Sequence, residues 1–89
     1  MSETKVRAME IPELGGLLIL HELSASKMAK LLLEQEVRPE DEVVLTMLTM
    51  SVRDQYNRDV FSEAHFKELR EKHDATFSRL LVEVAALQM

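Results

Sequence analysis

Residues 39–53 read PEDEVVLTMLTMSVR, and this stretch predicts the helix around which the rest of the chain packs. Pro39 suits a first helical position because its fixed φ is already helical, and the three acids that follow face the positive end of the helix dipole. The apolar residues cover about 220° of the helix circumference, whereas a surface helix needs only about 100°. We therefore expect helix 40–53 to be central or to help form an interface.

Two further helices are predicted on either side of this central segment. Ser24 is the expected N-cap of a helix over residues 25–36, whose Met and Leu residues form an apolar stripe. Downstream, Ser62 is the expected cap of a third helix. Phe61 and Phe66 flank that start with the spacing of a hydrophobic staple, which fixes the direction in which the chain enters the helix.

The segment RDQYNRDVFSEAHF, residues 53–66, joins the second and third helices and resembles a metal loop at first sight. An EF-hand loop needs oxygen ligands at its first, third and fifth positions, and then a glycine. Counting from Asp54 places Tyr56 third and Arg58 fifth, so these side chains cannot build the calcium cage. We interpret the segment as an Asx-type turn in which Asn57 tolerates left-handed geometry.

The N-terminal residues predict a short β-hairpin. Residues 3–11 alternate weakly between polar and apolar, and LLILHEL at 17–23 favours a strand at its start. Between them, PELGG at 12–16 is a strong turn signal. Because two strands alone are marginally stable, this hairpin must pack against helices.

A fourth helix completes the predicted fold. Asp74 is its expected N-cap, and its apolar residues repeat at helical spacing. The sequence thus predicts a mainly α fold: a compact four-helix domain with a short N-terminal β-hairpin. We expect a single domain over residues 1–89, with residues 1–23 as the hairpin or extended segment and 24–89 as the helical body.

Composition excludes several functional classes. The net charge is −5 and the bases are dispersed, so a nucleic-acid partner is not expected. The absence of Cys removes disulfides and thiolate sites and suits a reducing cytoplasm. The apolar run Leu17–Leu20 is too short to span a membrane. These features predict a soluble cytoplasmic protein without a membrane partner.

Catalytic and metal-binding patterns are weak. His65 and Glu68 could share one helix face, and His73 lies eight residues after His65. A zinc site needs at least three well-placed ligands. We expect exposed histidines, no metal and no cofactor. The serines fall at caps or first turns, and no phosphate-binding glycine loop is present, so we expect no enzyme. A metal-dependent enzyme using the two histidines would have to contain stoichiometric metal.

The surplus of apolar residues is the most informative feature of the sequence. Two readings stay open: all of these side chains form the core, or part of them forms a protein-binding surface with adaptable Met side chains. Under the second reading, the partner-binding residues are predicted to be Leu18, Leu20, Met47 and Met50.

Two stretches resemble the tail assembly chaperones of long-tailed, siphovirus-like bacteriophages. The first is MSVRDQYNRDVFSEAHFKELREKHDATFSRLLVEVAAL, residues 50–87, and the second is EIPELGGLLILHELSA, residues 10–25. The similarity covers an acidic turn, a Phe before a Ser cap, a Leu-Arg-Glu-Lys segment and a final apolar helix. Two positions depart from that pattern, because Asn57 stands where the family commonly has Gly and His65 where it more often has an acid.

This resemblance implies a non-enzymatic protein that binds the tape measure protein, helps recruit major tail subunits and leaves before the virion is complete. It also implies a place in the bacterial host cytoplasm, and in many relatives a longer form made by ribosomal frameshifting. The alternative, from a different class, is a small helical regulatory or structural subunit that forms homo-oligomers through its second helix.

Overall fold

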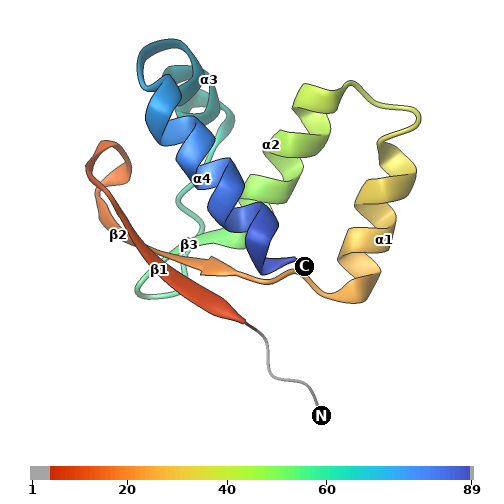
Figure 1. Cartoon of the computed structure of the whole chain (residues 1–89), viewed down its shortest axis with the longest axis horizontal. Helices are drawn as coiled ribbons and strands as arrows, with labels where there is room; N and C mark the ends of the chain where they lie inside the picture. The colour runs from red at the N-terminus through yellow and green to blue at the C-terminus, as the bar shows by residue number, and fades with distance from the viewer. Residues whose placement is uncertain (1–4, 89) are drawn as a thin grey trace.

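The computed structural model describes residues 5–88, in which a three-stranded antiparallel sheet is packed against helices (Figure 1). The strand order is β1-β2-β3, with β2 in the middle. A 3₁₀ turn, Pro12–Leu14, connects the first two strands. The elements in chain order are β1 Val6–Ile11, β2 Gly16–His21, α1 Ala25–Glu34, α2 Glu40–Ser51, β3 Val52–Asp54, α3 Glu63–Lys72 and α4 Asp74–Leu87.

The prediction of a mainly α, four-helix domain is wrong, because the sheet has a third strand and the described chain is a small mixed α/β domain. Helix α2 ends at Ser51, and Val52 adopts extended geometry with φ −92° and ψ 121°. Val52 then pairs with Leu20, and Asp54 with Leu18. The hairpin leaves one edge of β2 with unpaired backbone groups, and the β-branched Val52 fits a strand at that edge.

The predicted hairpin is confirmed. Strands β1 and β2 pair in register from Val6 opposite His21 to Ile11 opposite Gly16. Gly15 and Gly16 have φ values of 98° and 119°, a region that glycine enters without steric cost. The first residues of the predicted hairpin, 1–4, lie outside the described residues.

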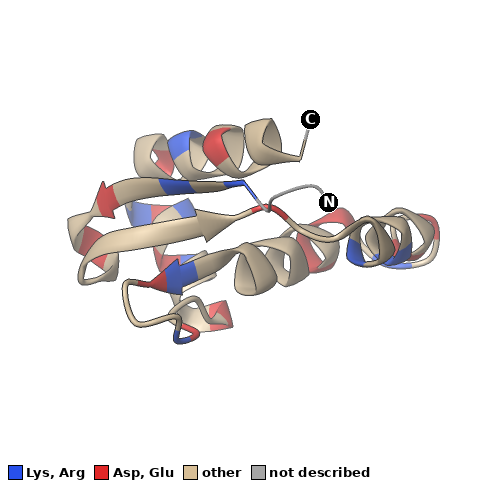
Figure 2. Ribbon diagram, turned by 90° about the horizontal axis from the view of Figure 1, so that it is seen from below, with Lys and Arg blue, Asp and Glu red and all other residues tan. Residues whose placement is uncertain are grey.

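The sheet has one covered face and one open face. Inward residues of all three strands are buried, and α2 and α4 contact this sheet (Figure 1). On the opposite face, Val6 is 57% exposed and Leu17 is 47% exposed. Helix α1 extends past the end of the strands (Figure 2). The buried apolar cluster is Met9, Ile11, Leu18, Leu20, Leu48, Val52, Phe61, Phe66, Leu69, Phe77, Leu80, Val84 and Leu87.

Side-chain caps explain where α1 and α3 begin. Lys27 donates its backbone N–H to Ser24 Oγ at 3.3 Å, and His65 donates its backbone N–H to Ser62 Oγ at 3.4 Å, as predicted for both caps. The prediction of Asp74 as an N-cap is wrong. A single non-helical residue, His73, separates α3 from α4, so Asp74 already belongs to the helix.

The expected central position of helix 40–53 is only partly right. Within Glu40–Ser51, only Leu48 and Ser51 are buried, and Ser51 Oγ donates to the carbonyl of His21 at 2.6 Å. The helix contacts α1, α4, β2 and β3. Its remaining apolar side chains are half-buried, and Val44, Leu45 and Met47 among them pack against the core cluster.

Candidate protein-binding groove

The four predicted partner-binding residues separate into two groups. Leu18 and Leu20 are 1% and 0% exposed, because both point from β2 into the core. Neither belongs to the surface of this structure, which corrects the predicted partner-binding set. Met47 and Met50 lie on α2, are half-buried, and line two hollows between α1 and α2.

Helix α1 is held against the rest of the protein by few apolar contacts. Leu31 is its only buried residue, and α2 is its main neighbour. The turn after α1 is fixed by backbone hydrogen bonds, including one from Arg38 N–H to the Glu34 carbonyl at 2.8 Å. This turn sets the two helices side by side with Leu31 between them, so a groove is left on each side of that leucine.

One side of the contact is an apolar groove, with a cavity volume of about 150 Å³. Its rim is exposed to solvent, since the Leu32 side chain is 60% exposed. A cavity of this size is below the usual range for a small-molecule site and suits one or two apolar side chains of another protein. The lining residues are Met28, Leu31, Leu32, Gln35, Val43, Val44 and Met47.

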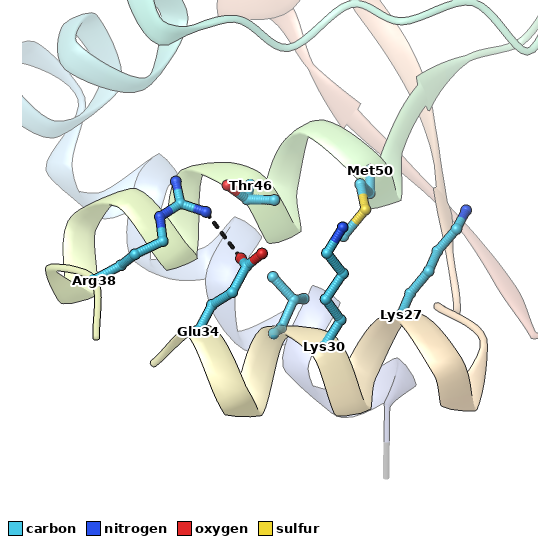
Figure 3. A pocket seen from close by; sticks show the side chains of 7 residues that line it. Lys27, Lys30, Glu34, Arg38, Thr46 and Met50 are labelled. Atoms are coloured by element: carbon cyan, nitrogen blue, oxygen red, sulfur yellow. Dashed lines mark hydrogen bonds and ion pairs between the residues drawn. The ribbon is translucent and has the colours of Figure 1, made fainter. Parts of the chain in front are cut away.

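The other side is a basic groove with a volume of about 420 Å³, shown in Figure 3. Arg38 donates to Glu34 Oε2 at 2.8 Å and lies 3.6 Å from Glu42 Oε2. Lys30 rises from α1 toward Met50 of α2, whereas Lys27 points away from Met50, and both line the groove (Figure 3). The wall thus combines cationic groups with apolar surface from Leu31 and Met50.

Sequence reasoning missed the contribution of α1 to this site. The run Leu31–Leu33 places three leucines on different sides of the helix, since successive residues turn by 100°. Leu31 becomes buried, Leu32 lines the apolar groove, and Leu33 is 71% exposed outside it. Val37, in the turn after the helix, is 82% exposed. The three consecutive leucines were the signal in the sequence that α1 exposes apolar side chains, because no single helix face could bury all three.

The joint at residues 53–66 contains the expected turn. Asp54 Oδ1 accepts the backbone N–H groups of Tyr56 and Arg58, both at 2.8 Å, and Asn57 has a left-handed φ of 62°. The backbone N–H of Arg58 is the main cause that lowers the pKa of Asp54. Partial burial opposes that shift, and the Arg58 guanidinium adds to it. Phe61 and Phe66 contact edge to face with ring centroids 6.5 Å apart, as the staple predicted.

The three histidines lie in different surroundings and make different contacts. His65 Nδ1 accepts the backbone N–H of Ser62 in a capping box. His73 Nδ1 lies 3.8 Å from Glu13 Oε1, and His21 is half-buried on β2. Between residues 5 and 88, no group of three or more His, Asp or Glu side chains is arranged to hold a metal ion. In the same range, no helix is long and apolar enough to cross a membrane.

The chain matches no protein-family model, and no curated protein or solved structure is significantly similar to it. The resemblance to phage tail assembly chaperones therefore stays a prediction.

Proposed function

We propose that this protein is a non-enzymatic assembly chaperone that holds apolar segments of a phage tape measure protein and helps to recruit major tail subunits. It would act in the cytoplasm of the bacterial host and be absent from the mature virion. The observation that carries the proposal is the loose packing of α1 against α2. Helix α1 has ten residues, but only one of them, Leu31, is buried.

The physical support comes from the energy of burial. Removing apolar surface from water gains about 25 cal/mol per Å², so an exposed leucine or valine at a groove is a favourable contact for another polypeptide. Met28 and Met47 are unbranched and flexible, and can adapt to segments of different shape. Contacts of this kind are modest one by one, which suits a chaperone that must release its client.

The open face of the sheet is a second exposed apolar surface. Val6, Leu17 and the half-buried Ile19 lie there, on a different element from the groove. A protein that brings two tail components together needs two separate surfaces. We assign the tape measure segment to the groove and the major tail subunit to this sheet face.

Co-expression with a cognate tape measure protein tests the groove. We expect the wild-type chain to raise the soluble fraction of the tape measure protein, and Leu32→Glu to abolish this effect. Leu33→Glu is the matched control, because it places the same charge on the same helix but outside the groove. A tape measure protein that is equally insoluble with and without the wild-type chain contradicts the proposal.

The open sheet face also favours a second candidate, the homo-oligomeric structural or regulatory subunit. Exposed strands with apolar side chains can pair or stack with a second copy. Light scattering over a dilution series separates the two candidates. A tight oligomer that persists on dilution and ignores tail proteins supports the subunit, whereas a monomer that binds the tape measure protein supports the chaperone.

A further inference from the structure

The basic groove between α1 and α2 stands out in an acidic protein. Its three bases and the two acids that contact Arg38 sum to a net positive charge of one, although the whole chain carries −5. Most bases elsewhere are paired with acids. Among the described residues, the bases without an ion-pair partner are Lys27, Lys30, Lys72 and Arg79. Two of these four line the same groove.

The neighbouring acids form ion pairs with other residues and not with Lys27 or Lys30. Glu34 is four residues after Lys30, the spacing of a common helical ion pair. Its carboxylate turns instead to Arg38, which it contacts at 2.8 Å, and the dashed line in Figure 3 marks this pair. Asp41, near the start of α2, is bound to Arg70 of α3 at 2.6 Å. Lys30 and Lys27 therefore face the groove with unbalanced charge.

We infer that the groove recognises an acidic amphipathic helix of the partner, with carboxylates on Lys27 and Lys30 and an apolar residue against Leu31 and Met50. This inference rests on the proposed function and adds the basic groove, on the other side of Leu31 from the apolar groove, to the surface that the bound segment would contact. Charge complementarity carries it, because ammonium groups beside an apolar wall favour a ligand that has an anionic edge and an apolar edge. The ten residues of α1 span about 15 Å, so a partner helix of about three turns matches the groove.

The test uses two synthetic helical peptides of equal length. Both carry leucines at i, i+3, i+4 and i+7, and one edge is glutamate in the first peptide and lysine in the second. Binding to the full chain is measured by fluorescence anisotropy. We expect the glutamate peptide to bind about tenfold more tightly than the lysine peptide at low salt, and this preference to shrink as salt rises.

Charge reversal in the protein completes the test. Lys27→Glu with Lys30→Glu should invert the preference between the two peptides. Lys72→Glu with Arg79→Glu makes the same charge change outside the groove and should leave it in place. All four positions are exposed, and circular dichroism checks that each variant is folded.

The outcomes separate this inference from the proposed function. Equal binding of both peptides, lost in Leu32→Glu, overturns the acidic preference and leaves the apolar groove intact as the binding site. A preference that survives reversal of Lys27 and Lys30 also overturns the inference. If neither peptide binds, and the tape measure protein is not solubilised either, both the inference and the proposed function fail.

Discussion

Two helix pairs of similar size differ in how much of their apolar surface they bury. Helices α3 and α4 are separated by a single residue, His73, and Phe66 meets Phe77 edge to face with ring centroids 5.3 Å apart. Helices α1 and α2 are joined by a turn of several residues, and Leu31 is the only buried side chain on α1. Both pairs carry many large apolar side chains, but α3 and α4 bury most of theirs in the core.

Burial, and not helix formation, distinguishes the two pairs, and under the proposed function it separates a structural part of the chain from a binding part. Helix α4 packs on the sheet and α3 packs on α4. Together they contribute six side chains to the buried cluster: Phe66, Leu69, Phe77, Leu80, Val84 and Leu87. The α1–α2 pair leaves comparable apolar groups in contact with water. We therefore expect the first pair to determine global stability and the second to determine affinity for a partner.

Leu80→Ala should have the largest effect on stability. Leu80 is fully buried on α4, so the substitution loses transfer free energy and leaves a cavity, at a cost of about 3 kcal/mol in the free energy of unfolding. Urea denaturation measures this change. Leu33→Ala is the matched control on α1, where a side chain that is 71% exposed should change stability by less than about 0.5 kcal/mol. Equal losses in both variants would break the comparison between the two helix pairs.

The contrast also explains what the sequence could predict. Several features set by neighbours in the chain were predicted correctly: the hairpin turn at Gly15–Gly16, the caps Ser24 and Ser62, and the left-handed Asn57. Each depends on residues within a few positions. The N-cap expected at Asp74 was the local exception. Strand β3 was missed because Val52 pairs with Leu20, which is distant in the sequence, and no local pattern carries that information.

The candidate site was half predicted for a related reason. Residues Leu17–Leu20 are all apolar, so the alternation that separates the inner and outer faces of a strand is invisible in the sequence. Register in the sheet buries Leu18 and Leu20 and leaves Leu17 exposed. Met47 and Met50 remain at the groove because helix α2 has a partner on only part of its apolar face.

Leu31→Ala should have a smaller and local effect, which sharpens the comparison. Leu31 is the single buried contact of α1, so its loss should let α1 separate from α2 while the sheet and α4 stay folded. We expect a global loss below about 1 kcal/mol, because most of the core does not touch this side chain. Hydrogen exchange should show faster exchange for α1 amides and unchanged protection in β2 and α4. Uniform loss of protection along the chain would show that α1 folds as part of the core.

The smallest effect concerns Asp54, in the joint that leads from the α1–α2 pair to the α3–α4 pair. The backbone N–H of Arg58 holds the pKa of Asp54 below its ordinary value of 3.8, with the Arg58 guanidinium 2.7 Å from Oδ2. Because the folded pKa is the lower one, the ionised carboxylate stabilises the fold above pH 3.8, and this contribution is lost as pH falls through the folded value.

Asp54→Asn isolates the charge, since an Asn side chain can still accept the backbone N–H groups of the turn. The wild type should be slightly more stable than the variant at about pH 6, and the difference should shrink as the pH falls below 3.8 and through the lower folded pKa. Urea midpoints across this range measure the difference. If the gap between the two proteins stays constant down to the lowest pH, the carboxylate charge has no part in fixing the joint. The joint would then be fixed by its other contacts, among them the Arg53–Asp59 ion pair at 2.8 Å, the Phe61–Phe66 contact and the Ser62 cap.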